Sequence, residues 1–333
     1  MQLFELRNPH GLEARITDYG AILTAMRVPD RHGRLGDVVH GFDAPEAYRG
    51  AHPYFGAIVG RVANRIAHGR FELDGESHTL AVNEPPHHLH GGWRGWDRAL
   101  WQAEPRESAE GAALALRYRS RHGEEGYPGH VRAQVLYTLT SEDALQLDIT
   151  ATSDRATPLN LAHHVYWNLG GTGSGSIRGH RLRLFASRYT PSDATRIPTG
   201  EIAPVVGTPF DFTREKPIGQ DLDRVGGEPA GYDVNFVVDG EAGMLRRVAQ
   251  LTDSGSGRVL ELLSDQPGVQ LYTGNGLDGS TTGKGARHLR HSAVCLETQH
   301  FPDAIHKPAW REGVILRPGC TYRHRIVYRF RTA

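Results

Sequence analysis

Residues 144–150 read ALQLDIT, and this alternation of apolar and polar side chains decides the fold. Successive side chains of a β-strand point to opposite faces, so this pattern places Leu145, Leu147 and Ile149 on one buried face. Further segments of the same kind are 113–120 (ALALRYRS), 135–140 (VLYTLT), 181–188, 258–263, 269–272 and 321–330 (TYRHRIVYRF). Helical periodicity is scarce, so the chain is predicted to consist mainly of strands with few helices.

Turn-forming residues separate these segments. The chain contains 40 Gly and 19 Pro, as expected for many short strands joined by turns. Asp74-Gly75, between FEL at 71–73 and HTL at 78–80, is typical of a tight hairpin turn. The segments are spread evenly, without a linker or a visible repeat. We therefore expect one all-β domain over residues 1–333, built as a large antiparallel β-sandwich.

Composition limits the partners of the chain. Lys plus Arg and Asp plus Glu are both 38, which argues against binding to nucleic acid or to an anionic membrane. The first residues, MQLFELRNPHGLEARI, lack the apolar stretch of a secretion signal, and no apolar run is long enough to span a bilayer. Cys295 and Cys320 are too few for a disulfide framework. We expect a cytoplasmic protein with a small uncharged ligand and an oligomeric state that the sequence leaves open.

Several common catalytic motifs are absent. The Gly-rich stretch at 171–175 lacks the strand-to-helix pattern of a dinucleotide site, and Gly283-Lys284-Gly285 lacks the hydroxyl residue that follows Lys in a phosphate-binding loop. No G-x-S-x-G sequence indicates a serine hydrolase. The three lysines stand beside Gly or Pro, which argues against a buried Schiff-base lysine.

Polar residues are instead concentrated in a few apolar segments. Such residues are costly to bury unless they are paired, so each segment needs an explanation. The segments are 60–66 (GRVANRI), 83–92 (NEPPHHLHGG), 160–168 (NLAHHVYWN), 231–238 (GYDVNFVV), 267–277 (PGVQLYTGNGL) and 293–303 (AVCLETQHFPD). In this order, they resemble the signature stretches of the aldose 1-epimerase (galactose mutarotase) family. The resemblance extends from ITDYGA near Ile16 to LRPGCTYRH near Leu316, and it implies the galactose mutarotase-like supersandwich fold.

The resemblance implies roles for individual residues. Glu297 in CLETQ corresponds to the general base of the family, and His164 in NLAHHVYWN corresponds to the general acid. The sugar-binding positions of the family correspond to Asn64, Arg65, His90, Asp233 and Gln270. The chain differs from the usual family pattern at His163 (usually Asn), Val165 (Ser), Trp167 (Phe), Val234 (His) and His300 (Asn). The family activity would be interconversion of the α and β anomers of a free hexose such as galactose or glucose.

The residue types suit this chemistry without reference to the family. Anomer exchange requires removal of the O1 proton and protonation of the ring oxygen, which opens the ring to an aldehyde. A carboxylate and a histidine beside the anomeric carbon can perform both transfers and reverse them on reclosure. Neither a metal nor a cofactor is required.

Other interpretations are available for the same residues. In these interpretations Glu297 forms a salt bridge with an arginine, and His164 is a histidine of the core. Arg65 and Asp233 then pair with each other or with the backbone. We expect structural roles for His87 and His163, and lip or core positions for Trp93 and Trp96. Two other functions compete: a carbohydrate-binding module without turnover, and a metal-dependent sugar isomerase or oxygenase using the His88-x-His90 pair. The missing carboxylate shortly after His90 counts against the metal enzyme.

Overall fold

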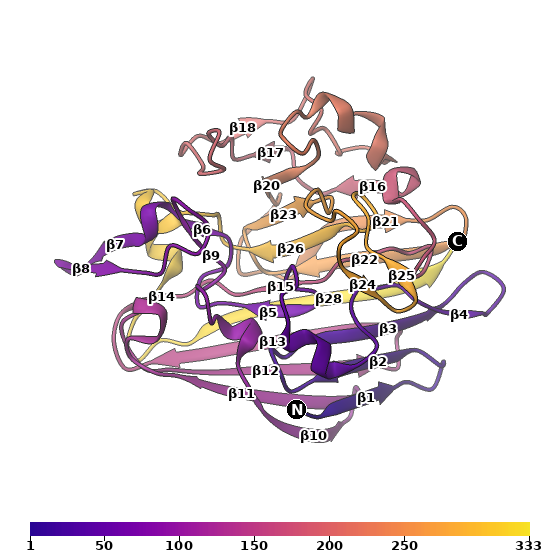
Figure 1. Cartoon of the computed structure of the whole chain (residues 1–333), viewed down its shortest axis with the longest axis horizontal. Coiled ribbons are helices and arrows are strands. Elements are labelled where there is room, and N and C mark those ends of the chain that lie inside the picture. Colours follow the sequence, from indigo (N-terminus) through magenta and orange to yellow (C-terminus); the bar gives the residue numbers. More distant parts are fainter.

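Long antiparallel strands form the main sheet of the protein. The computed structural model describes residues 1–333, and its nine-stranded sheet has the order β10-β11-β12-β13-β28-β22-β21-β16-β19. The strands are β10 (Gln102–Ser108), β11 (Gly111–Ser120), β12 (Val131–Thr140), β13 (Ala144–Ser153), β28 (Tyr322–Thr332), β22 (Arg258–Ser264), β21 (Arg246–Thr252), β16 (Arg181–Leu184) and β19 (Lys216–Pro217). β28, the last strand in sequence, lies in the interior of this sheet between β13 and β22 (Figure 1).

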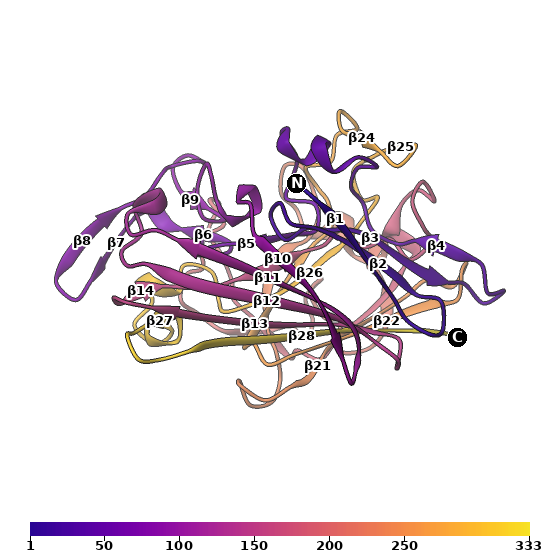
Figure 2. The ribbon, with the colours of Figure 1, turned by 90° about the horizontal axis from the view of Figure 1, so that it is seen from below.

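Two smaller sheets complete the architecture. A four-stranded sheet contains β1 (Leu3–Arg7), β2 (Glu13–Thr17), β3 (Leu23–Pro29) and β4 (Leu35–Asp37). A five-stranded sheet has the order β18 (Ala203–Pro204), β17 (Arg188–Tyr189), β20 (Asp233–Val237), β23 (Gly268–Tyr272) and β26 (Cys295–Gln299). Figure 2 shows β1, β2 and β3 in a layer above the long strands β11, β12, β13 and β28. This arrangement is a sandwich of antiparallel sheets, as the sequence predicts.

Short strand pairs and helical turns connect the sheets. The pairs are β5 (Ala57–Val59) with β15 (Ala162–His164), β6 (Arg65–Ile66) with β9 (His88–Leu89), β7 (Arg70–Leu73) with β8 (Glu76–Thr79), β14 (Thr157–Pro158) with β27 (Ile315–Leu316), and β24 (Thr282–Gly283) with β25 (Ala286–Arg287). The helices are 3-10 turns: η1 (Pro45–Arg49), η2 (Ala67–Gly69), η3 (Trp96–Arg98), η4 (Glu124–Gly126), η5 (Ile177–Gly179), η6 (Ile218–Gln220), η7 (Leu222–Arg224), η8 (Ala304–His306) and η9 (Arg311–Val314). None of them has the length and apolar character needed to cross a membrane.

One hydrophobic core joins the three sheets. Apolar side chains at alternate strand positions meet there, and they include Ile16 and Leu23 of the four-stranded sheet, Leu147 of the nine-stranded sheet, and Val269 and Leu296 of the five-stranded sheet. The apolar alternation that the sequence displays is therefore the pattern that buries one face of each sheet.

Two local predictions had different outcomes. Asp74-Gly75 forms a two-residue hairpin turn between β7 and β8, because both residues have positive φ, 51° and 84°. The prediction of one continuous strand over residues 181–188 is wrong, because two separate strands share this segment. β16 ends at Leu184 and β17 begins at Arg188. Between them the chain passes from the nine-stranded sheet to the five-stranded sheet.

Candidate active site

One cavity brings together all seven site residues that are predicted from the sequence. It has a volume of about 160 Å³, room for one small molecule, and its wall contains Asn64, Arg65, His90, His164, Asp233, Gln270 and Glu297. The other wall residues are Pro53, Tyr54, Glu84, Leu89, Tyr166, Arg196 and Tyr272. Residues more than two hundred positions apart in sequence thus face the same space.

The five-stranded sheet supplies three of these side chains from one face. Gln270 on β23 lies directly opposite Glu297 on β26, and Asp233 on β20 lies opposite Tyr272 on β23. The intervening residues Leu271 and Leu296 point into the main core. Side chains alternate between the two faces of a strand. The polar residues next to those buried in the core therefore point into the cavity.

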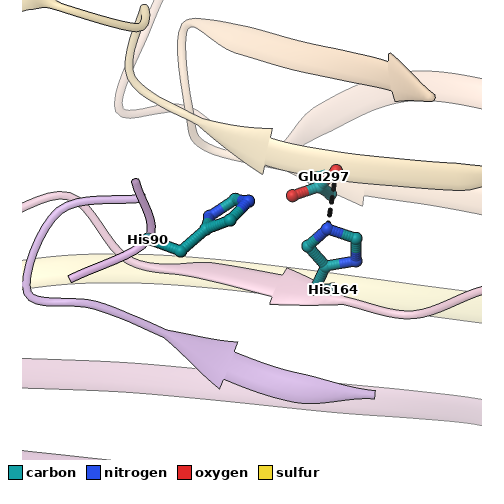
Figure 3. Close-up of side chains that lie close together, drawn as sticks. All are labelled: His90, His164 and Glu297. Carbon is teal, nitrogen blue, oxygen red and sulfur yellow. Dashed lines mark ion pairs between the residues drawn. The ribbon is translucent and has the colours of Figure 1, made fainter. Parts of the chain in front are cut away.

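His164 reaches the cavity from the short strand β15. Its Nε2 lies 3.7 Å from Oε1 of Glu297, and Figure 3 shows the ring directed toward that carboxyl group. Both side chains are buried. The preceding residue, His163, points the other way, where its Nε2 lies 3.2 Å from the hydroxyl of Tyr137. The structural role predicted for His163 agrees with this position.

Asn64 and His90 line the cavity, and both have an unusual backbone conformation. They adjoin the paired strands β6 and β9, and both have positive φ, 59° for Asn64 and 48° for His90. The His90 N–H donates to the Asn64 carbonyl at 3.0 Å, which fixes the two residues side by side. Gly91 follows with φ 91°, and a Cβ there would overlap the carbonyl oxygen of Gly60. Glycine in the HLHGG motif therefore permits this close approach.

The contacts of His90 also fix its tautomer. The Asn64 N–H donates to His90 Nδ1 at 3.1 Å, so that nitrogen carries no proton. Burial, with His164 and Arg65 nearby, holds the pKa of His90 well below its ordinary value, so the ring is neutral and its proton is on Nε2. His90 thus offers an N–H donor to a ligand in the cavity. A metal would need the Nε2 lone pair, so this contact counts against His90 as a metal ligand.

The alternative of a metal site built on His88 and His90 is wrong. The positive φ of His90 ends the strand alternation, so the two rings do not share a site. His88 instead lies 2.7 Å from the carbonyl of Ala81 and 2.7 Å from the hydroxyl of Tyr127. His90 lies beside His164 and Glu297 (Figure 3), with one possible ligand atom of each within 4.8 Å of the others.

Opposite charges alternate around the cavity. Arg65 forms a bidentate ion pair with Glu84, with both N–O distances at 2.6 Å. Asp233 accepts a hydrogen bond from Gln270 Nε2 at 2.6 Å and lies 3.5 Å from Arg196 Nε. The alternative prediction that Arg65 and Asp233 pair with each other is therefore wrong, because each has a nearer partner.

Burial disfavours the charged form of both central groups. Burial raises the pKa of Glu297 well above its ordinary value, the Asp233 carboxylate raises it further, and Arg65 opposes both effects. Burial also lowers the pKa of His164 to about 3. One oxygen of Glu297, Oε2, has no hydrogen-bond partner. The site is therefore a buried acid–base pair that shares one proton, with a free carboxyl oxygen.

Some wall residues were not predicted from the sequence, and the residues predicted to be structural lie outside the wall. Glu84, Tyr166 and Tyr272 lie within the six segments that resemble the family, so those segments were a signal for them. Tyr54 and Arg196 lie outside all six segments. Trp96 is a core residue and Trp93 is exposed, and neither contributes to the wall. His87 is buried and accepts the His68 N–H at 3.1 Å. The five departures from the family pattern also lie outside the wall: His163, Val165, Trp167, Val234 and His300.

The chain is similar to known proteins over nearly its whole length. The family model described as aldose 1-epimerase matches residues 2–329. Galactose mutarotase of Bos taurus is 44% identical, with 100% of this chain and 95% of that protein covered. Aldose 1-epimerase of Escherichia coli (strain K12) is 32% identical, with 99% and 95% covered. The solved structure of a GalM/aldose epimerase homologue from C. elegans superposes with a TM-score of 0.90 at 30% identity, over 100% of this chain and 99% of that chain. The chain belongs to the aldose 1-epimerase family.

Proposed function

We propose that Glu297 and His164 carry the proton transfers by which this enzyme interconverts the α and β anomers of free aldohexoses. The chain is an isomerase of the aldose 1-epimerase type, and the residues that act in it are our assignment. The observation that carries this assignment is the 3.7 Å approach of His164 Nε2 to Glu297 Oε1 inside the cavity. O1 and the ring oxygen of a sugar are bonded to the same carbon, so two groups this close can each reach one of them.

Ring opening begins with the shared proton on His164. Burial favours this proton on Glu297 and Arg65 opposes that effect, so hydrogen bonds from the bound sugar to the carboxylate would move the proton to His164. Glu297 then accepts the O1 proton while His164 donates to the ring oxygen. The bond between C1 and the ring oxygen breaks, and its electron pair stays on that oxygen as C1 becomes an aldehyde. After rotation about the C1–C2 bond, the two transfers run backwards on the other face.

The surrounding residues fit an uncharged polyhydroxylated ligand. His90 offers an N–H, Gln270 has a carbonyl oxygen without a partner, and Asp233 is an acceptor. Arg65 is already neutralised by Glu84, so it does not offer an unpaired charge to a phosphate. Galactose and glucose are therefore the proposed substrates, differing mainly in KM, and hexose 6-phosphates should be poor ones.

Two substitutions test the assignment. Glu297→Gln and His164→Asn should each lower kcat for mutarotation by about a hundredfold or more, the usual scale of general acid–base catalysis. Polarimetry on freshly dissolved α-galactose and α-glucose gives the rates, and thermal unfolding checks that each variant folds. The exposed residues Glu241 and His32 provide matched controls, Glu241→Gln and His32→Asn, which should keep full activity. Near-normal turnover by folded Glu297→Gln enzyme would overturn the assignment.

A further inference from the structure

Arg196 occupies the mouth of the cavity between two carboxylates. Its Nε lies 3.5 Å from Oδ2 of Asp233, and its Nη1 lies 3.8 Å from Oε1 of Glu84. These carboxylates belong to separate parts of the wall, β20 and the segment before β9. The guanidinium group therefore bridges two separate parts of the cavity wall.

The two arginines of the wall differ in how firmly they are held. Arg65 makes two hydrogen bonds of 2.6 Å to Glu84, and its side chain is 6% exposed. Arg196 makes only the two longer ion pairs, and its side chain is 46% exposed. A guanidinium group has five N–H donors, so Arg196 has donors to spare for a ligand. Arg65 is a fixed part of the wall, and Arg196 is an available donor group.

Local hydrogen bonds hold the loop that carries Arg196, although the side chain itself is exposed. The carboxylate of Asp193 accepts the N–H groups of Thr195 at 2.8 Å and Ile197 at 3.1 Å, and the Thr195 hydroxyl at 2.7 Å. The Arg196 N–H donates to the Asp193 carbonyl at 3.0 Å, and Arg196 has a φ of 68°. A non-glycine residue rarely holds this conformation, so the local hydrogen bonds fix where the side chain starts.

We propose that Arg196 is a substrate-binding residue that closes over the sugar and grips hydroxyl groups remote from the anomeric carbon. A hydroxyl group between Arg196 and Asp233 would accept from the guanidinium and donate to the carboxylate, which satisfies both. The ligand class follows from the charges. Glu84 and Asp233 already balance Arg196 and Arg65, so the mouth favours a neutral polyol over an anion. The inference rests on the proposed sugar substrate and extends it to a residue outside the quoted motifs.

The role is tested by separating binding from turnover. Arg196→Ala should raise KM for galactose by about tenfold, the value of one charged hydrogen bond, and should change kcat by less than about threefold. Arg196→Lys should recover only part of the loss, because lysine keeps the charge but not the planar fork. Arg188, an exposed arginine on β17 that is not part of the wall, gives the matched control Arg188→Ala, with unchanged KM.

A direct binding measurement keeps this test independent of the catalytic assignment. The dissociation constant for galactose is measured by calorimetry in Glu297→Gln protein with and without Arg196→Ala. A weakening of about tenfold is expected even if other residues prove to transfer the protons. An unchanged dissociation constant and KM in folded Arg196→Ala protein would overturn the proposal, as would a loss confined to kcat.

Discussion

Mild acid should destabilise this protein strongly, because many of its histidines are buried and neutral. His40 is an example: it is 3% exposed, and its ring stacks on His288 at 4.5 Å between centroids. Burial, with His288 and Lys284 nearby, lowers the pKa of His40 from 6.5 to about 3. The histidines whose pKa burial lowers to about 3 or 4 also include His52, His88, His163, His164, His180, His300 and His324.

The magnitude follows from the protons that unfolding takes up. A lowered folded-state pKa contributes stability that is present above the unfolded value of 6.5 and is lost as pH falls toward 3. Between pH 7 and pH 5 one such histidine removes about 2 kcal/mol. Glu297 and Asp97, whose pKa burial raises (to about 7 for Asp97), act in the opposite direction, but they are outnumbered. Eight such histidines against two such acids leave six uncompensated. Even three of them would remove about 6 kcal/mol, a large share of the roughly 5–15 kcal/mol typical of folded proteins.

Urea unfolding at several pH values measures this effect. The free energy of unfolding should fall steeply between pH 7 and pH 5, and His40→Asn should reduce the steepness by about one proton. The control is His32→Asn, because His32 is exposed, and its slope should equal that of the unaltered protein. A free energy that changes by less than about 2 kcal/mol over this interval would refute the reasoning.

Three further predictions concern activity. kcat/KM should follow a bell-shaped pH profile, because Glu297 and His164 together must hold one proton. The acid limb lies below pH 6.5, because the pKa of His164 is lowered from 6.5. The alkaline limb lies above pH 4.5, because the pKa of Glu297 is raised from 4.5. A flat profile with proton transfer rate-limiting contradicts the pair. Dialysis against EDTA should leave the rate unchanged, because the proposed proton transfers need no Lewis acid; loss of activity that Zn²⁺ restores would favour a metal enzyme. Among galactose, glucose, xylose and glucose 6-phosphate, kcat/KM should be lowest for the phosphate, and a preference for it would disprove a site of balanced charge.

The sequence predicted the strands well because their alternation is long and regular. Residues 144–150 and 321–330 lie in β13 and β28, where each alternate side chain meets the core. Residues 181–188 show the limit of this reasoning. An apolar run does not reveal that its two ends pair with different sheets, since pairing is decided by distant strands.

Some residues of the site could be predicted from the sequence, and others could not. Glu297 and His164 stand out as polar residues in apolar segments, and the cavity contains both. The partners of Arg65 were not predictable, because the choice between Glu84 and Asp233 depends on how loops from separate segments meet. Arg196 carries no local signal at all, since an arginine in a turn is usually a solvated surface residue. Its position over the cavity emerges only from the folded chain.

The interior position of β28 has a consequence for biosynthesis. This strand follows every other strand of the nine-stranded sheet in sequence, yet it pairs with both β13 and β22. Until β28 has been synthesised, the other strands of this sheet can pair only as two groups, β10-β11-β12-β13 and β22-β21-β16-β19, each with an unpaired edge at the position of β28. Unpaired edges are templates for aggregation, and long-range pairing is slow. The nascent protein thus depends on its final strand to join the two halves, and it is most exposed to misassembly just before synthesis of that strand is complete.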